Sequence, residues 1–250
     1  MHMKPVPPVL VVIAHGSRDP RHAATVHALV RRVRSLRPGL RVETGFLDFN
    51  IPSVHGVLES LAAEGGVRDV VALPLLLTRA FHAKADIPAV LRDAPPQLRI
   101  RQAEVLGPSP LLLAALERRL YEAGLTPADK SSTGVVLASA GSTDPEAIAV
   151  IAEIAREWRR TGWCAVRPAF ASASLPRTED AVRELRALGC SRVAVAPYVL
   201  APGFLPDRIA RGAAEADVLA DVLGPAPEVA RALLERYDSA RTPALAAVGA

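Results

Sequence analysis

Three side chains in the first third of the chain, those of His15, Asp48 and His82, are of types that bind divalent metals or accept protons. Neutral imidazoles and carboxylates are common ligands of divalent first-row metals. Histidine also exchanges protons near neutral pH, so the same groups suit acid–base catalysis. All six histidines of the chain lie at or before residue 82. We therefore expect the chemistry of this protein to depend on its first half.

The chain consists of two related repeats, and the second repeat lacks all three of these side chains. Val-Ile-Ala-His-Gly-Ser-Arg-Asp-Pro at 12–20 returns as Val-Leu-Ala-Ser-Ala-Gly-Ser-Thr-Asp-Pro at 136–145. The alternative to a functional role is that each histidine is an isolated polar residue at a strand end. A histidine kept for packing should be needed in both repeats, so the joint loss favours one shared site. The replacements are Ala140 for His15, Ser172 for Asp48 and Leu205 for His82.

The elements that must position these residues alternate between strands and helices. Apolar runs predict strands at 9–14, 42–47, 70–77 and 100–105, and apolar periodicity predicts helices at 20–37, from 52, at 87–91 and at 110–121. The second half repeats this order, with strands at 135–137, 166–170 and 193–199 and helices at 145–159 and 176–188. Such alternation is typical of parallel sheets joined by right-handed crossovers.

We therefore predict an α/β fold of two similar domains, each a Rossmann-like parallel β-sheet with helices on both faces, related by a pseudo-two-fold axis. The expected domains are 1–125, which carries the site, and 134–250, a degenerate repeat, joined by a linker at 126–133. Ligands of such sheets bind beyond the carboxyl ends of the strands. The three candidate residues follow three successive strands, so the fold predicts that they meet at one edge.

Other residues near these strand ends are candidates for binding an anionic ligand. Gly16 and Ser17 offer N–H groups and a hydroxyl at a helix start, and Arg18 offers a guanidinium. A plain strand-to-helix turn, capped by Ser17 or Asp19, explains Gly16-Ser17 equally well, because the repeat keeps both residues. Arg18 becomes Thr143, which favours a functional role. The residues flanking His82, for which a solvated loop is the alternative, are Thr78, Arg79 and Lys84.

Several remaining polar residues are predicted to be structural. Asp86 precedes Ile-Pro and is expected to cap a helix in preference to binding metal. The two cysteines are far apart in sequence, match no metal or disulfide spacing, and are expected to be buried small side chains. The histidines expected to lie outside the site are His22, His27 and His55, and the cysteines are Cys164 and Cys190.

Three motifs together resemble the sirohydrochlorin chelatase family, the small ATP-independent (type II) chelatases, in its two-repeat long form. They are His-Gly-Ser-Arg-Asp-Pro at 15–20, Phe-Leu-Asp at 46–48 before a Pro-led helix, and Pro-Leu-Leu-Leu-x-x-x-Phe-His-x-x-x-Asp-Ile-Pro at 74–88. The resemblance covers essentially the whole chain. It implies the type II chelatase fold and the insertion of Fe²⁺, Co²⁺ or Ni²⁺ into sirohydrochlorin, a macrocycle with eight carboxylates.

The same resemblance implies that His15 and His82 handle the metal and accept protons, with Asp48 as their acidic partner. The family usually has glutamate at position 48, and aspartate is one methylene shorter. The metal is a substrate, and no permanently bound cofactor is expected. The chain has no Gly-x4-Gly-Lys-Ser/Thr motif to bind ATP. The chain lacks a histidine-rich tail and a cysteine cluster, accessories of some cobalt-using members, which weakly favours iron.

Composition narrows the classes of partner. The first half holds 16 basic and 11 acidic side chains, a balance of +5 that favours an anionic ligand. Only 4% of residues are aromatic, and no basic run is interleaved with aromatics, so nucleic acid is not an expected partner. No apolar run reaches the length of a membrane helix. Together with two cysteines and no recognisable signal peptide, this predicts a cytoplasmic protein.

Two other classes of function remain as alternatives. One is a metal or tetrapyrrole carrier that binds without inserting the metal. The other is a histidine phosphoenzyme at His15, which would need several arginines nearby, whereas only Arg18 is close in sequence. Single-repeat relatives form dimers, so the two-repeat chain is expected to act as a pseudo-dimeric monomer.

Overall fold

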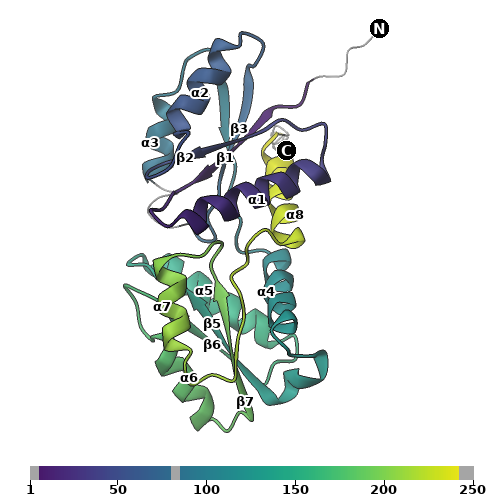
Figure 1. The fold of residues 1–250 in the computed structure, drawn as a ribbon, viewed down its shortest axis with the longest axis vertical. Coiled ribbons are helices and arrows are strands. Elements are labelled where there is room, and N and C mark those ends of the chain that lie inside the picture. The colour runs from purple at the N-terminus through teal and green to yellow at the C-terminus, as the bar shows by residue number, and fades with distance from the viewer. Residues whose placement is uncertain (1–5, 80–84, 242–250) are drawn as a thin grey trace, which may run out of the picture.

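The computed structural model describes residues 6–79 and 85–241, and its strands there form two four-stranded parallel sheets (Figure 1). The strand orders are β2-β1-β3-β4 and β6-β5-β7-β8, so both repeats have the same topology. This confirms the predicted two-domain α/β fold. The strands are β1 (Val9–Ala14), β2 (Val42–Phe46), β3 (Asp69–Pro74) and β4 (Arg99–Gln102), then β5 (Thr133–Ser139), β6 (Ala165–Phe170), β7 (Arg192–Tyr198) and β8 (Val218–Leu219).

Helices follow the strands, as apolar periodicity predicted for 20–37, from 52, and for 87–91, 110–121, 145–159 and 176–188, and two further helices complete the second half. The helices are α1 (Pro20–Leu36), α2 (Val54–Ala63), α3 (Ile87–Arg92) and α4 (Pro110–Glu122), a 3₁₀ segment η2 (Pro127–Ser132), then α5 (Pro145–Arg159), α6 (Thr178–Ala187), and the two further helices α7 (Phe204–Gly212) and α8 (Pro227–Arg241). None of the helices within 6–79 and 85–241 combines the length and apolar character that a bilayer span requires.

The repeated Asp-Pro pair starts the first helix of each half. The Asp19 carboxylate accepts a hydrogen bond from the Arg21 amide, and Asp144 accepts one from the Glu146 amide. In both helices proline occupies the first turn, where it loses no intrahelical hydrogen bond. The Asp-Pro pair thus has the same structural role in both repeats.

The capping role predicted for Asp86 is wrong. Its backbone is already helical, with φ −68° and ψ −47°, and its side chain makes no capping hydrogen bond. A capping residue has non-helical backbone angles, which direct its side chain toward the first free amides of the helix. Helical backbone at residues 85 and 86 removes this geometry.

The two halves exchange their closing helices. Helix α4 ends the first repeat but packs against β7 of the second sheet, whereas α8 ends the second repeat and packs against β3 and α1 (Figure 1). The two helices also contact each other. The segment at 126–133 therefore separates the repeats along the chain, while each sheet is covered by a helix from the other repeat.

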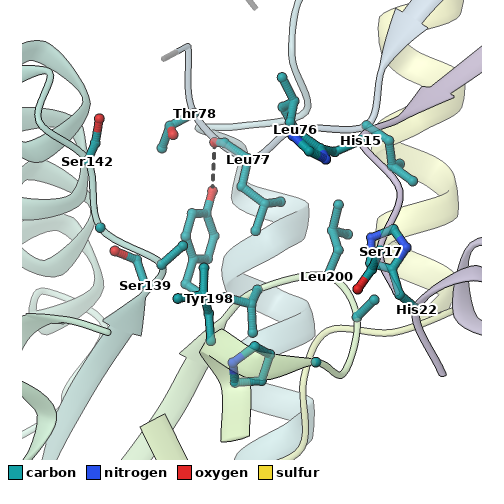
Figure 2. A pocket seen from close by; sticks show the side chains of 18 of the residues that line it. His15, Ser17, His22, Leu76, Leu77, Thr78, Ser139, Ser142, Tyr198 and Leu200 are labelled. Atoms are coloured by element: carbon teal, nitrogen blue, oxygen red, sulfur yellow. Dashed lines mark hydrogen bonds between the residues drawn. The ribbon is translucent and has the colours of Figure 1, made fainter. Parts of the chain in front are cut away.

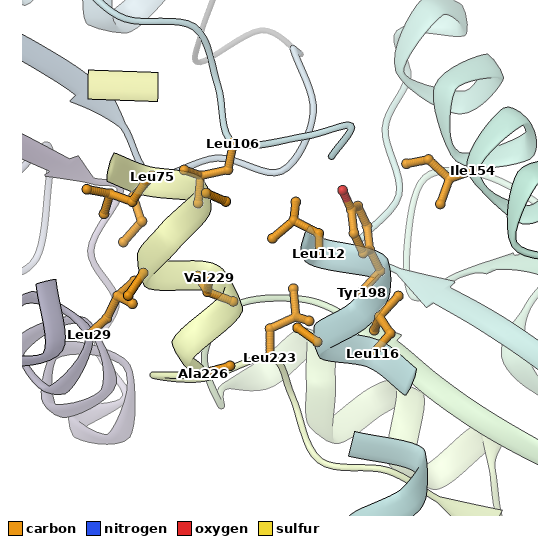
Figure 3. Packing of buried hydrophobic residues seen from close by; sticks show 14 of the residues in the cluster. Leu29, Leu75, Leu106, Leu112, Leu116, Ile154, Tyr198, Leu223, Ala226 and Val229 are labelled. Carbon is orange, nitrogen blue, oxygen red and sulfur yellow. The ribbon is translucent and has the colours of Figure 1, made fainter. Parts of the chain in front are cut away.

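One hydrophobic cluster runs through this exchange and joins the two halves (Figure 3). Leu112 and Leu116 of α4 and Val229 and Leu233 of α8 are fully buried in it. Truncating a buried leucine to alanine typically costs about 2–5 kcal/mol of stability, so this shared core contributes strongly to holding the two halves together.

Polar contacts add to the docking of α8. The Tyr237 hydroxyl donates to the Pro8 carbonyl at 2.7 Å, and Arg37 pairs with Asp238. The Arg37 guanidinium lowers the pKa of the Asp238 carboxyl through this pair.

The expectation that both cysteines are buried is wrong for Cys164. Cys190 is buried, whereas Cys164 is exposed where the chain enters the edge strand β6. Although 26 residues apart, the two sulfur atoms lie 3.8 Å from each other as free thiols. Burial and the neighbouring Cys164 thiol raise the pKa of Cys190.

This difference predicts two rates of thiol modification. Cys164 should react with iodoacetamide at least about tenfold faster than Cys190 in the native protein, because thiolate fraction and access both set reactivity. Alkylation followed by mass spectrometry should therefore be biphasic, and Cys164→Ser should remove its fast phase. Equal rates in native protein would contradict the burial of Cys190.

Candidate functional site

A cavity of about 490 Å³ lies between the two halves, at the carboxyl ends of the central strands (Figure 2). The loops after β1 and β3 and the start of α1 line it from the first half, and their counterparts line it from the second. Equivalent positions of the two repeats thus line the same cavity. Ala140, Ser142 and Ile151 are the counterparts of His15, Ser17 and Val26. The cavity is where parallel α/β sheets bind ligands, and its volume is in the range of small-molecule sites.

Tyr198 at the end of β7 helps to close this cavity across the two halves. Its side chain is buried, and its hydroxyl lies 3.5 Å from the Leu77 carbonyl oxygen of the first half (Figure 2). Burial raises the pKa of the Tyr198 phenol above its ordinary value, so it stays protonated. Tyr198 therefore provides an uncharged contact between the two repeats.

His15 follows β1 directly and lines the cavity. Its side chain is half-buried, and Nδ1 lies 3.3 Å from the Gly16 carbonyl oxygen. The imidazole also stacks on the Phe49 ring, with the two ring centres 6.4 Å apart and the planes 23° from parallel. A half-buried imidazole at a cavity wall is placed to bind a metal or accept a proton.

The backbone of Asp48 lies beside that of His15. Its amide donates to the His15 carbonyl at 2.9 Å. Its carboxylate accepts a hydrogen bond from the Phe49 amide at 2.8 Å, and the residue is exposed and outside the cavity lining. The structure thus brings Asp48 to the predicted edge, with its carboxylate directed into its own turn.

His82 and Lys84 lie outside the described residues. Within 6–79 and 85–241, no group of three histidine, cysteine or acidic side chains has the arrangement of a metal site. The complete set predicted for the metal, His15, Asp48 and His82, therefore stays a prediction.

Gly16 and Ser17 have structural roles that the second repeat reproduces. Gly16 has a φ of +95°, and a Cβ there would lie 1.9 Å from the Asp48 carbonyl oxygen. The Ser17 amide donates to the Asn50 side chain at 2.8 Å, and its hydroxyl oxygen accepts from the Asp19 amide. The Ser17 amide is consequently engaged within the protein.

The second repeat has the same connections. Gly141 has a φ of +94°, and Ser142 makes equivalent hydrogen bonds to Ser174 and Asp144. The turn interpretation of Gly-Ser therefore has direct support in both halves.

The side chains predicted to bind an anionic ligand differ in their position relative to the cavity. Arg18 is exposed, and its guanidinium carbon lies 5.2 Å from the centre of the Phe49 ring. Thr78 is half-buried and lines the cavity, whereas Arg79 is exposed and outside the lining. Binding of substrate by these three side chains stays a prediction.

His22 belongs to the cavity, although the sequence analysis placed it outside the site. It lies in the first turn of α1, lines the cavity with His15, and its Nδ1 is buried without a hydrogen-bond partner (Figure 2). The equivalent residue of the second repeat is Ala147, which also lines the cavity. This histidine-to-alanine replacement was the signal that could have identified it.

His22 should make the stability of the protein depend on pH. Burial, with a smaller effect of His15, lowers the pKa of His22 below its ordinary value of 6.5. Its neutral form is therefore favoured by folding, and this contribution is fully present above pH 6.5. It is lost as the pH falls from there through the lower pKa of the folded protein. Thermal melts at pH 7.5 and 5.5 should show a smaller acid-induced loss for His22→Ala than for wild type, and identical losses would contradict this assignment.

The geometry defines the class of this protein, an α/β protein of two parallel-sheet repeats with a cavity between them. The chain belongs to the CbiX family, whose model matches residues 9–123 and 134–240. The two matched segments coincide with the two repeats. The resemblance inferred from the three sequence motifs is confirmed.

Curated relatives align with about four fifths of this chain. The sirohydrochlorin cobaltochelatase of Priestia megaterium is 30% identical over 207 residues, which are 80% of this chain and 66% of that protein. The sirohydrochlorin ferrochelatase of Bacillus subtilis (strain 168) is 26% identical over 208 residues, 81% of this chain and 77% of that one. The chain thus spans just under two thirds of the cobaltochelatase.

Solved structures agree on the fold. SirB from Bacillus subtilis with Fe³⁺ superimposes with a TM-score of 0.81 at 24% identity, covering 94% of this chain and 96% of that one. CbiX, described as the terminal enzyme for biosynthesis of siroheme in denitrifying bacteria, gives a TM-score of 0.67 at 20% identity, covering 93% and 99%. The fold with two parallel sheets is therefore shared with both structures.

Proposed function

We propose that this protein inserts a divalent metal, Fe²⁺ or Co²⁺, into sirohydrochlorin without ATP, in sirohaem or cobalamin biosynthesis. The observation that carries the proposal is His15, which follows the first strand and lines the cavity between the repeats, opposite an alanine at the equivalent position. The relatives named as cobaltochelatases and ferrochelatases support the same reaction class.

Each step of metal insertion has a candidate group in this chain. The incoming ion must exchange water for other ligands, and the macrocycle must lose two pyrrolic protons. His15 and His82 are proposed to hold the ion and receive these protons, with Asp48 as the acidic partner. Neutral imidazoles suit both tasks near neutral pH. The metal is a substrate here, and Ni²⁺ is a further candidate.

The carboxylates of the macrocycle are proposed to meet the rim of the cavity. The proposed ligands are the loop after β1, with Gly16, Ser17 and Arg18, and the loop after β3, with Thr78, Arg79 and Lys84. Arginine pairs with carboxylates in a bidentate manner, whereas lysine attracts them as a point charge. The apolar walls from Val26, Leu77 and Ile151 suit the flat ring.

We further propose that the chain works as a pseudo-dimeric monomer in the cytoplasm. Both walls of the cavity come from one chain, and the exchanged helices bury the contact between the halves. Two cysteines as free thiols are usual in a reducing compartment. Light scattering at micromolar concentration should give one chain per particle, and a stoichiometric dimer would contradict this.

The decisive experiment is anaerobic absorbance of sirohydrochlorin with Fe²⁺, Co²⁺ and Ni²⁺ in turn. Substoichiometric protein should convert the whole pool of macrocycle, at a rate well above that without protein, and the three rates rank the metals. The alternative function, a metal or tetrapyrrole carrier, predicts a bound spectrum that saturates at one equivalent with no turnover for any metal.

A further inference from the structure

Phe49 lies in the turn after β2 and contacts two of the predicted site residues. Its ring stacks with the His15 imidazole, with centres 6.4 Å apart, and the Arg18 guanidinium carbon lies 5.2 Å from its centre. The side chain is nevertheless 49% exposed, so it contributes little to the core. An exposed phenylalanine between an imidazole and a guanidinium requires an explanation other than core packing.

The backbone conformation of Phe49 is also unusual for a residue with a large side chain. Its φ is +60°, in the left-handed region that bulky side chains rarely adopt. Hydrogen bonds within the turn hold it there, from the Phe49 amide to the Asp48 carboxylate at 2.8 Å and from the Asn50 amide to the Asp48 carbonyl at 2.7 Å. A small or flexible residue would meet the demands of this turn more easily.

The second repeat contains the same turn without the ring. Ala173 has a φ of +59°, and the Ser174 amide donates to the Ser172 carbonyl at 2.6 Å. The turn therefore forms with alanine. The ring is lost together with its neighbours, because Ala140 replaces His15 and Thr143 replaces Arg18.

A neighbouring residue shows that exposure alone does not explain this pattern. Ile51 is 88% exposed in the same loop, and its counterpart Leu175 is 73% exposed. An exposed apolar side chain is thus kept at that position in both repeats. Of these two exposed apolar side chains, only the ring of Phe49 is present in the repeat with His15 and absent from the other.

We infer that Phe49 is a positioning residue, whose ring fixes the His15 imidazole and the Arg18 guanidinium relative to each other. This inference rests on the proposed function. A base and a carboxylate-binding cation held around one aromatic ring suit a flat ligand with carboxylates on its rim. Cation–π and ring-stacking contacts supply such orientation at partly exposed sites.

The test compares Phe49→Ala with Phe49→Tyr, which keeps the ring, and with Ile51→Ala, the matched control from the same loop. Because small displacements of reacting groups have large effects on rate, kcat/KM for sirohydrochlorin and Co²⁺ should fall about 30-fold in Phe49→Ala, with most of the loss in kcat. The other two variants should stay within about twofold of wild type, and the Tm of Phe49→Ala within about 2 °C, because Ala173 already occupies this turn. In a His15→Ala background, Phe49→Ala should reduce kcat no further.

A second readout is independent of turnover. The ring protons of His15 should shift in the NMR spectrum of Phe49→Ala, because the ring current of Phe49 is removed, and Ile51→Ala should leave them unchanged. Wild-type protein that inserts no metal would remove the proposed function, while the NMR result would still decide whether Phe49 positions His15. Unchanged kcat/KM and unchanged His15 signals in Phe49→Ala, equal losses in Phe49→Tyr, or a Tm lowered by many degrees would each overturn the inference.

Discussion

His15→Ala should lower the rate of metal insertion by at least about 100-fold, the usual effect of removing a positioned proton acceptor. His15 lies at the wall of the cavity, where it is half-buried beside Phe49. The substitution gives the first repeat the residue that Ala140 already supplies in the second. Stability should therefore change little, with Tm within about 3 °C of wild type. Anaerobic absorbance of sirohydrochlorin with Co²⁺ measures the rate, and thermal unfolding measures the stability.

The control for this variant is His55→Ala. His55 is an exposed residue of α2 whose Nε2 pairs with Glu59, away from the cavity lining. Its removal should leave the insertion rate within about twofold of wild type, as surface substitutions usually do. His82→Ala should reduce the rate as His15→Ala does, if both imidazoles serve one metal. A His15→Ala protein that retains wild-type kcat would exclude this residue from the reaction.

The sequence predicted the sheets and the edge at which the site lies, because these depend on local patterns. The β-branched run before His15 indicates a strand buried on both faces, and the Asp-Pro pair indicates the start of a helix. Comparison of the two repeats then selected His15 as a candidate, because two repeats with one fold should share the residues that only packing requires, and His15 lines the cavity. The family model that matches 9–123 and 134–240 confirms the family that the motifs indicated.

The exchange of α4 and α8 could not be read from the sequence. Leu112 and Leu116 of α4 occupy the same positions in their repeat as Val229 and Leu233 of α8, and all four are fully buried. Either helix thus presents a suitable apolar face to either sheet. Which sheet it covers is decided by the path of the preceding loop, a property of tertiary structure that apolar periodicity does not report.

The composition of the site was incomplete for a different reason. His22 and Phe49 are replaced by Ala147 and Ala173, so the comparison that found His15 also applied to them. They were missed because only metal-binding or acid–base side chains that directly follow strands were considered, whereas His22 lies in the first turn of α1 and Phe49 is apolar. The direction of the Asp48 carboxylate depends on one hydrogen bond, which residue types cannot specify.

Gly16→Ala should lower both the stability of the protein and its rate of metal insertion. A Cβ at residue 16 would lie 1.9 Å from the Asp48 carbonyl oxygen, and the φ of +95° is unfavourable for alanine. The two turns must therefore separate, at a cost of about 3–5 kcal/mol in the free energy of unfolding, which corresponds to a Tm lower by about 10 °C. Because the Asp48 amide donates to the His15 carbonyl, this separation displaces both residues, and the folded protein should also lose most of its insertion rate.

Gly141→Ala provides the matched control within the same chain. The contact there is the same, with a Cβ 1.9 Å from the Ser172 carbonyl oxygen and a φ of +94°, so Tm should fall by a similar amount. Its turn, however, carries Ala140 and Ser172 in place of His15 and Asp48. Assayed at 15 °C, where both variants are folded, Gly141→Ala should keep most of the wild-type rate and Gly16→Ala should not. Equal losses of rate would mean that the second repeat takes part in the reaction. A loss of rate in Gly16→Ala alone would show that the glycine turn stabilises both repeats, whereas the reaction depends on the first repeat only.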